Sequence, residues 1–402
     1  MKHRQIIPPT IYFFTLMLYL SICVLTSCRS RTVKALATDG DTIPLKYAQH
    51  LVLVKHDGFT EALVLNPWNK GTLLHRYFLV PKGQGGNQLA QQLASTKESK
   101  MVRSDVIRTP ITRGIIFTSA HCQLMYELGC PKAIAGVCDL QYINISDIQK
   151  RSKKDIVDCG QSFQPNMERI VDIQPEALLV SPFENNGGFG KLEKLKIPVI
   201  ETADYMETSP LGRAEWIRFY GLLFGSKASD SSYVSCTEKA DSIFNVVEQT
   251  YLSLKKKAAA LPLGASVLTE RKTGGVWYVP GGKSTMGILL RDAHARYEWA
   301  EDSHSGSLAL NPEQVLDRAS NITVWALKRF GGKPLTRKDL LDEYKGYVHL
   351  AAMTRGKIYQ CDTSTEPYFE ETSFHPERLL REFILLSHPE VKDMGRMKYY
   401  KK

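Results

Sequence analysis

The segment "SCTEKADSIFNVVEQTYLSLKKKAAAL", residues 235–261, decides how the chain is organised. It contains neither glycine nor proline, so it has no residue that would stop a helix. Its apolar side chains at helical spacing are Ile243, Val246, Val247, Tyr251 and Leu254. This spacing predicts a single amphipathic helix of roughly seven turns.

Strands and helices alternate on both sides of this helix. Before it, the apolar runs "GIIFTS", "AIAGVCD", "PEALLVSPF" and "IPVIETADY" are separated by helical patterns such as "HCQLMYELG" and "PNMERIVDIQ". The pattern "LGRAEWIRFYGLLFG" predicts one more helix. After residue 261 the alternation resumes, from "ASVLTE" to "HPERLLREFILLSHPE". The sequence therefore predicts an α/β fold of two α/β lobes with mostly parallel strands, joined by one long α-helix.

Residues 47–81 follow a different pattern. The runs "LVLVKHDGFTEALVLNPW" and "LHRYFLVPKG" are strand-like, and Asp57-Gly58 is a hairpin turn signal. This predicts an N-terminal β-hairpin addition. The predicted boundaries are 45–234 for the N-terminal lobe, 235–261 for the connecting helix and 262–402 for the C-terminal lobe.

The N-terminus has the pattern of an export signal. Two basic residues precede the apolar run 11–25, which is short for a membrane span and is followed by "LTSC". "LTSC" resembles a bacterial lipobox, which implies a signal peptide over 1–27 and lipid attached to Cys28. The polar residues 28–44 would then form a flexible tether. An ordinary secretory signal or an uncleaved helix is the alternative.

Composition excludes some classes of partner. The chain has 402 residues, 43% of them hydrophobic, and a formal net charge of +10. Its lysines are scattered and do not interleave with aromatic residues as a stripe, so we expect no nucleic-acid partner. No C-x-x-C spacing indicates a zinc site, and we expect structural thiols or disulfides, with Cys138–Cys159 as the first pairing to consider. The cysteines after Cys28 are Cys122, Cys130, Cys138, Cys159, Cys236 and Cys361.

The stretch "VWYVPGGKSTMGILLRDAHA", residues 276–295, ends like a phosphate-binding loop. That loop requires a glycine where Trp277 stands, and Pro280 removes a backbone donor from it. Phosphate binding is therefore excluded here. An aromatic pair at the end of a strand, followed by a Gly-Gly turn, indicates instead a loop that faces another ligand.

Five segments together resemble the helix-hinged solute-binding lipoproteins of ABC importers, the class that includes cobalamin and ferric-siderophore binding proteins. They are "PNMERIVDIQPEALLVSPFE", "PLGRAEWIRF", "WYVPGGKSTMGILLRDA", "SGSLALNPEQVLDRASNITVW" and "EPYFEETSFHPERLLREFILLSHPE". The resemblance implies a ligand cleft between the lobes, a connecting helix that limits hinge motion, and two surface glutamates that dock on a permease dimer. Glu168 in "NMERI" and Glu313 in "NPEQVL" match these positions; the alternative is that they only cap their helices.

Solutes in α/β folds bind beyond the carboxyl ends of the strands. Because Trp277 and Tyr278 are adjacent on a strand, they point to opposite faces, so at least one can face the cleft. In lobe one the predicted ligand-binding residues are Ser119, Ala120, His121, Ser181, Pro182, Phe183, Glu184 and Asn185. In lobe two they are Trp277, Tyr278, Pro280, His304 and Arg329.

The function that this implies is capture of an iron chelate or a corrinoid, without a cofactor, by a monomer anchored through lipid in the bacterial periplasm. A protein that binds haem or a bare metal ion directly is the alternative, although no histidine-rich loop is present; His121, His304, His349 and Glu201 would be the candidate ligands. An enzyme is not expected, because the chain lacks G-x-S-x-G and H-E-x-x-H motifs and His121 and Cys122 diverge on a helix. A structural lipoprotein is the third class.

Overall fold

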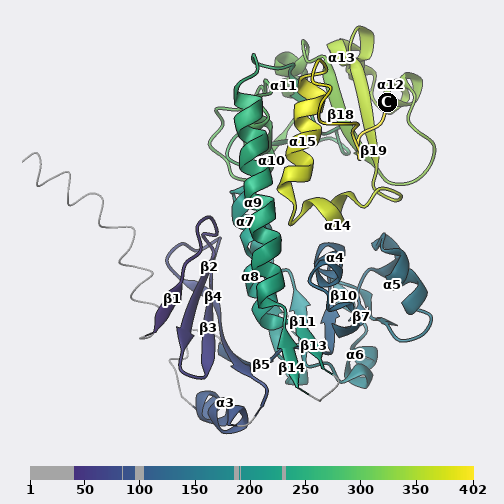
Figure 1. The fold of residues 1–402 in the computed structure, drawn as a ribbon. Coiled ribbons are helices and arrows are strands. Elements are labelled where there is room, and N and C mark those ends of the chain that lie inside the picture. The colour runs from purple at the N-terminus through teal and green to yellow at the C-terminus, as the bar shows by residue number, and fades with distance from the viewer. Residues whose placement is uncertain (1–39, 84, 96–103, 185–189, 191, 229–231) are drawn as a thin grey trace, which may run out of the picture.

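The computed structural model describes residues 40–83, 85–95, 104–184, 190, 192–228 and 232–402. Two α/β lobes lie at opposite ends of one long helix, and a separate sheet from the N-terminal part of the chain lies beside that helix (Figure 1). This confirms the predicted fold class. The signal peptide, the lipidation site Cys28 and the ligand-binding candidate Asn185 lie outside the described residues.

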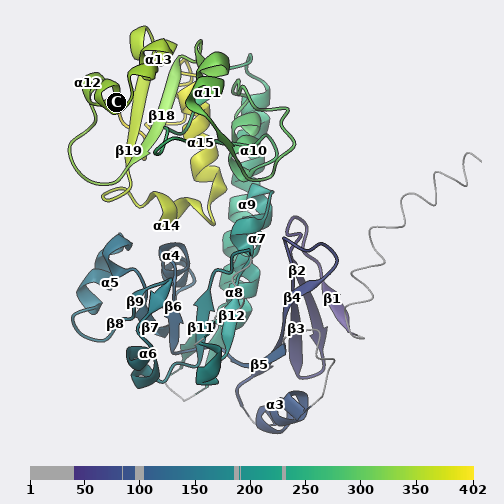
Figure 2. The same cartoon turned by 180° about the vertical axis from the view of Figure 1, so that it is seen from behind.

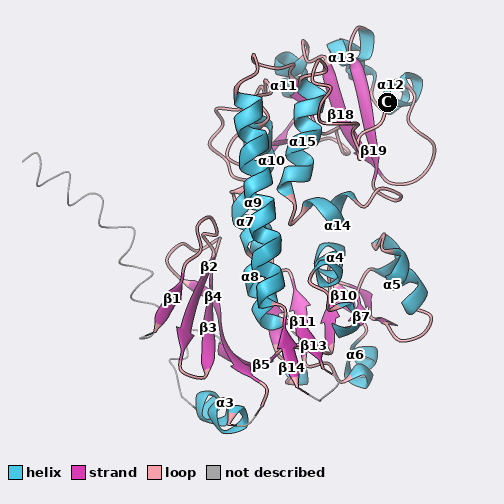
Figure 3. Ribbon diagram, in the orientation of Figure 1, coloured by secondary structure: helices cyan, strands magenta, loops and turns pink. Residues whose placement is uncertain are grey.

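The long helix α9 spans Thr237–Ala259, 23 residues, and Figure 3 shows it unbroken. Its buried residues are Ala240, Phe244, Val247, Tyr251 and Ala258. It packs on α8 of lobe one and on α15 of lobe two, so both lobes share its apolar face. Val246 was expected on this face but is 61% exposed, because it lies one position beyond the stripe that the lobes cover.

Lobe one is built on a parallel sheet in the order β12-β11-β6-β7-β8. These strands are β6 (Gly114–Ile116), β7 (Ile134–Val137), β8 (Val157–Asp158), β11 (Ala177–Val180) and β12 (Val199–Glu201). The lobe's helices are α4 (Ser119–Glu127), α5 (Ser146–Arg151), α6 (Met167–Ile173), α7 (Pro210–Glu215) and α8 (Ile217–Leu223). The pattern "LGRAEWIRFYGLLFG" was expected to form one helix, but the structure divides it into α7 and α8 at Trp216. Two short hairpins, β9 (Gly160–Gln161) with β10 (Gln164–Pro165) and β13 (Gly225–Lys227) with β14 (Tyr233–Ser235), complete the lobe.

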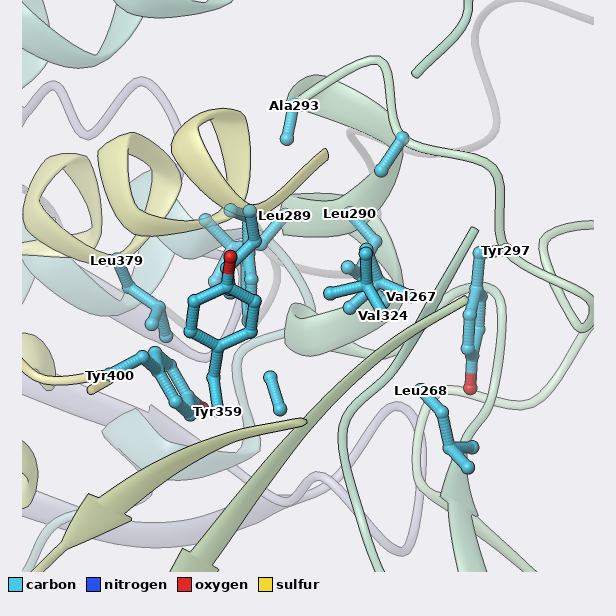
Figure 4. Packing of buried hydrophobic residues seen from close by; sticks show 14 of the residues in the cluster. Val267, Leu268, Leu289, Leu290, Ala293, Tyr297, Val324, Tyr359, Leu379 and Tyr400 are labelled. Atoms are coloured by element: carbon cyan, nitrogen blue, oxygen red, sulfur yellow. The ribbon is translucent and has the colours of Figure 1, made fainter. Parts of the chain in front are cut away.

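Lobe two has a smaller parallel sheet, β15-β18-β19, and a separate antiparallel pair, β16 with β17. The strands are β15 (Val267–Leu268), β16 (Trp277–Pro280), β17 (Ser307–Leu310), β18 (Val324–Arg329) and β19 (Lys357–Asp362). Its helices are α10 (Thr285–Asp292), α11 (Pro312–Ala319), α12 (Arg337–Glu343), α13 (Ala351–Thr354), α14 (Tyr368–Thr372) and α15 (Pro376–Ser387). Figure 4 shows how Leu289 and Leu290 of α10 pack near Val267 and Val324 of the sheet in the core of this lobe.

The N-terminal addition is larger than the predicted hairpin. It is a five-stranded sheet in the order β1-β2-β3-β4-β5, with the helix α3 (Gly86–Ser95). Its strands are β1 (Asp41–Ile43), β2 (Leu51–His56), β3 (Phe59–Leu65), β4 (Leu73–Pro81) and β5 (Ser104–Thr109). Strand β1 lies within residues 28–44, which were assigned to the tether, because its backbone pairs with β2. Any tether therefore ends before residue 41.

Two buried carboxylates attach this sheet to lobe one. Glu215 accepts the backbone N–H groups of Lys46, Tyr47 and Ala48 at 2.7–2.9 Å. Glu207 accepts those of Gln49 and His50 and the indole N–H of Trp216. The sheet and lobe one share a hydrophobic core, and Figure 2 shows the sheet beside α8 and β12.

All six cysteines after Cys28 are buried and free. The suggested Cys138–Cys159 disulfide is therefore not formed in this structure, and the alternative of structural thiols describes these residues. Burial is the main factor that raises the pKa of Cys159, to about 12, so this thiol stays protonated. Among the described residues, no helix has the length and apolar character needed to cross a bilayer.

Candidate functional site

The carboxyl ends of β6, β11 and β12 meet at one edge of the lobe-one sheet, because the three strands are parallel neighbours. Ser119 begins α4 directly beyond β6, and Ser181 follows β11; both side chains are half-buried. Pro182 is buried, and its carbonyl accepts the hydroxyl of Tyr205 at 2.5 Å. Phe183 is 60% exposed. The structure therefore gathers the predicted lobe-one residues, with Phe183 and the exposed Glu184 facing outward.

His121 is buried rather than open to a ligand. Its Nε2 lies 2.8 Å from the hydroxyl of Tyr220 and 3.2 Å from Asp204 Oδ1, and its Nδ1 lies 2.5 Å from Thr118 Oγ1. Burial alone would raise the pKa of Asp204, but His121, and after it Arg213, outweigh burial and lower it to about 2. Since both ring nitrogens are occupied, the expected ligand contact through His121 does not fit this structure. Ala120 is buried beside it, with 7% of its surface exposed.

Lobe two contains a pocket of about 470 Å³. It is lined by Glu270, Arg271, Thr273, Tyr278, Pro280, Ser284, Thr285, Met286, Ser305, Gly306 and Ser307. Thr285 donates a hydrogen bond to the backbone carbonyl of Glu207 at 3.0 Å, so this pocket adjoins lobe one. The loop that ends like a phosphate-binding motif thus forms a wall of a pocket, and its contact with a ligand stays a prediction.

Trp277 and Tyr278 point to opposite faces of β16, as expected for neighbours on a strand. Tyr278 is 48% exposed and lines the pocket. Trp277 is fully buried against Trp325 and Tyr347, and its indole N–H donates to the carbonyl of Glu270. Trp277 is therefore a core residue, and the expected ligand contact from it does not fit this structure.

The predicted charged residues of lobe two already have partners within the lobe. Arg329 pairs with Asp362 at 2.8 Å and donates to the carbonyl of Gly331. Lys328 pairs with Glu270 at 2.5 Å. His304 is exposed, lies directly before the pocket residue Ser305 and is hydrogen-bonded to Asp302, which leaves it accessible to a solute.

Exposed aromatic side chains follow the strands of both sheets. They are Tyr142 after β7, Phe183 after β11, Tyr205 after β12, Phe330 after β18 and Phe369 after β19, with Tyr278 on β16. The rings of Tyr142 and Phe330 meet edge-on across the two lobes, with centroids 5.5 Å apart. Of these residues, only Phe183 and Tyr278 were predicted from the sequence. The others could have been found as aromatics a few residues beyond a buried strand.

The model of the family described as "Periplasmic binding protein" matches residues 115–365, well over half of the chain. The chain belongs to the periplasmic binding protein family. The family match and the two lobes on one long helix confirm the resemblance seen in the sequence, and the chain is a solute-binding protein rather than an enzyme. In Cys122, the thiol that an enzyme of this kind would use, burial raises the pKa far above its usual range.

Relatives and experimental structures agree with this family. Two uncharacterized lipoproteins of Methanocaldococcus jannaschii are 24% and 23% identical, covering 86% and 83% of this chain and 82% and 83% of their own lengths. An ABC transporter substrate-binding protein of Listeria monocytogenes superposes with a TM-score of 0.51 at 17% identity, over 69% of this chain and 99% of its own. A periplasmic heme binding protein of Pseudomonas aeruginosa gives 0.51 at 16% identity, over 70% and 94%. At these identities the structures show a shared fold.

Glu168 and Glu313 occupy matching places in the two lobes. Each is exposed and lies in the first turn of its helix, α6 or α11. The N-terminus of α6 is capped by Asn166, and that of α11 by a capping box that begins at Asn311. Neither glutamate forms a hydrogen bond or ion pair with another residue that the structure describes. Both carboxylates are therefore available to a partner, and their place in the first turn also agrees with the alternative that they only stabilise the N-terminus of the helix.

The candidate metal ligands are dispersed. Glu201 is buried and bonded to His75 at 3.0 Å, while His304 and His349 lie on the surface of lobe two. In the part of the chain that the structure describes, no group of three or more His, Cys, Asp or Glu side chains could hold a metal ion.

Proposed function

We propose that this protein captures an iron chelate or a corrinoid outside the cytoplasm and delivers it to the permease of an ABC importer. The observation that carries the proposal is the series of exposed aromatic side chains beyond the strand ends of both lobes. Large planar or chelated solutes present wide apolar surfaces, which aromatic rings cover well.

The exposure of these rings is the reason to assign them to a ligand. Single exposed aromatics are common on proteins, but five that follow strands of the two parallel sheets, together with Tyr278 on β16, form a pattern that core packing does not explain. Tyr278 lies beside the lobe-two pocket, and Phe183 and Tyr205 lie at the edge of the lobe-one sheet. A solute held between them would cover apolar surface contributed by both lobes.

Polar side chains near these aromatic rings would orient the solute. Arg213 keeps about a quarter of its side chain exposed while its Nε lies 3.2 Å from Asp204 Oδ2. Its remaining N–H groups can donate to a carboxylate or phosphate of the solute. Ser284 and Ser305 line the lobe-two pocket, and the exposed His304 lies directly before Ser305.

Delivery of the solute to the permease would depend on residues at the outer surface of the two lobes. The free carboxylates of Glu168 and Glu313 would dock on cationic side chains of the two permease subunits, and the helix α9 would keep them at a fixed separation. Lipid on Cys28 would hold the protein at the membrane that contains the permease. The relatives come from an archaeon, so the compartment is proposed as extracytoplasmic and not as a bacterial periplasm in particular.

Calorimetric titration of the full chain tests the proposal. We expect saturable binding of a ferric hydroxamate or of cobalamin, and no binding of free Mn²⁺ or Zn²⁺; saturable binding of haem alone would favour the haem-binding alternative. Saturable binding of a bare ion that a chelator reverses would contradict the proposal, as would the absence of binding across a broad panel of ferric chelates and corrinoids.

A further inference from the structure

Besides the contacts of Thr285 with Glu207 and of Tyr142 with Phe330, the two lobes touch each other where α14 meets α4. Figure 1 shows α14 of lobe two above α4 of lobe one, and these two helices are in close contact. The contact involves Glu127 of lobe one and Glu370, Phe374, His375 and Arg378 of lobe two, which together are called the interlobe clasp below.

Phe374 is the apolar part of the clasp. Although it belongs to the lobe-two segment between α14 and α15, it is only 2% exposed and is part of the lobe-one hydrophobic core. Its ring centroid lies 5.5 Å from that of His121 and 5.5 Å from that of Tyr220, and the guanidinium of Arg213 lies 5.9 Å from it. Phe374 therefore covers the buried His121–Asp204 network beyond β6 and β12.

An ionic cluster lies next to this ring. His375 Nε2 is 2.7 Å from Glu127 Oε2 across the lobes, and its Nδ1 is 2.9 Å from Glu377 Oε1. Burial opposes the charged imidazolium, but the two carboxylates outweigh burial and raise the pKa of His375 to about 9. Arg378 Nη1 adds a longer contact to Glu127, at 3.8 Å. The cluster is therefore charged at neutral pH and mostly shielded from water.

A third contact joins the backbone of one lobe to a side chain of the other. The backbone N–H of Asn144 donates to Oε1 of Glu370 at 3.1 Å, and Glu370 is only 4% exposed. A buried charge-assisted hydrogen bond of this kind is among the stronger polar interactions in proteins. The exchange of this one amide hydrogen reports whether the lobes are in contact.

We propose that the interlobe clasp holds the two lobes at one separation before any solute binds, so that the cleft is pre-formed. With α9 on one side and the clasp at α4 and α14, relative rotation of the lobes requires that Phe374 leave a buried site and that Glu127 lose its partner. The clasp also closes the strand end beyond β6, where His121 was expected to meet a ligand. A solute is then restricted to the remaining strand ends, where the exposed aromatics lie; this part of the inference rests on the proposed function.

Amide hydrogen exchange of the solute-free full chain tests the clasp. Glu127→Gln preserves the shape of the side chain but removes the charge that faces His375. We expect it to accelerate exchange at Asn144 about tenfold or more, as for loss of a hydrogen bond to a charged group. Asp342→Asn is the matched control, because the ion pairs of Asp342 stay within lobe two and are exposed; it should leave exchange at Asn144 within about twofold of the wild type.

A second variant and a second measurement keep the test decisive. Phe374→Ala should also accelerate exchange at Asn144 and increase the radius of gyration in small-angle scattering, provided that circular dichroism shows an intact fold. Unchanged exchange at Asn144 in a folded Glu127→Gln protein would overturn the clasp. Because no solute is present, this outcome is independent of whether the proposed function is correct. With solute, the wild-type radius should change little.

Discussion

Substitutions at the adjacent residues Tyr278 and Trp277 distinguish a side chain that binds the solute from one that stabilises the fold. Tyr278 is 48% exposed at the pocket, whereas Trp277 is fully buried in the core of lobe two. We expect Tyr278→Ala to weaken solute binding and to leave the free energy of unfolding nearly unchanged. Trp277→Phe should do the reverse, because it leaves a void and removes the indole hydrogen bond to Glu270.

The magnitude follows from the area that a solute can cover. An aromatic side chain presents roughly 200 Å², so the exposed half of Tyr278 offers roughly 100 Å². At about 25 cal/mol per Å², full coverage contributes about 2.5 kcal/mol, or about 60-fold in Kd. If the solute covers half of that area, the contribution is about 1.2 kcal/mol and the loss about 8-fold.

Calorimetric titration with the best-bound solute measures these losses, and thermal unfolding monitors stability. Phe163→Ala is the matched control, because Phe163 is 79% exposed in the hairpin between β9 and β10 of lobe one and does not line the lobe-two pocket. Its Kd should equal that of the wild type. If Tyr278→Ala binds as tightly as Phe163→Ala, the exposed ring does not contact the solute and the lobe-two pocket is not part of the site.

Other parts of the molecule give further predictions. Glu168→Ala and Glu313→Ala should each reduce cellular uptake while calorimetric affinity stays constant, and the double variant should transport less than either; loss of affinity instead would mean that these residues line the site. Glu215→Gln should destabilise the protein by about 2 kcal/mol in urea unfolding, because it leaves a buried backbone donor without a charged acceptor, and an unchanged midpoint would refute this attachment. His375 has a folded-state pKa of about 9, above its ordinary 6.5, so its contribution to stability is complete below about pH 6.5 and is lost as pH rises through about 9. The difference in melting temperature between wild type and His375→Gln should therefore shrink over that range, and a constant difference would show that the imidazolium is not stabilised by its carboxylates.

Local patterns in the sequence predicted the features that depend on residues close together in the chain, such as the extent of a helix and the alternation of side chains along a strand. The periodicity of residues 235–261 predicted α9 to within two residues at each end, because one continuous apolar stripe serves both lobes. Alternation along β16 predicted that Trp277 and Tyr278 would face opposite ways, but not which one faces the core. That choice depends on Trp325 and Tyr347, which come from other elements of lobe two.

Contacts between distant segments were beyond such patterns. His121 lies where the sequence placed it, beyond β6, but Phe374 covers it from 253 positions further along the chain. Similarly, nothing local shows that Glu207 and Glu215 receive the backbone of residues 46–50, or that β5 pairs in parallel with β4. A residue beyond a strand end can therefore be assigned to a ligand only when no side chain of the other lobe covers it.

Native mass spectrometry of the protein purified from its own host tests the central claim most directly. We expect a bound, coloured species whose added mass matches an iron chelate or a corrinoid, and which Tyr278→Ala retains in smaller amount than Phe163→Ala. A protein that carries only a bare zinc or manganese ion, removable by a chelator, would contradict it.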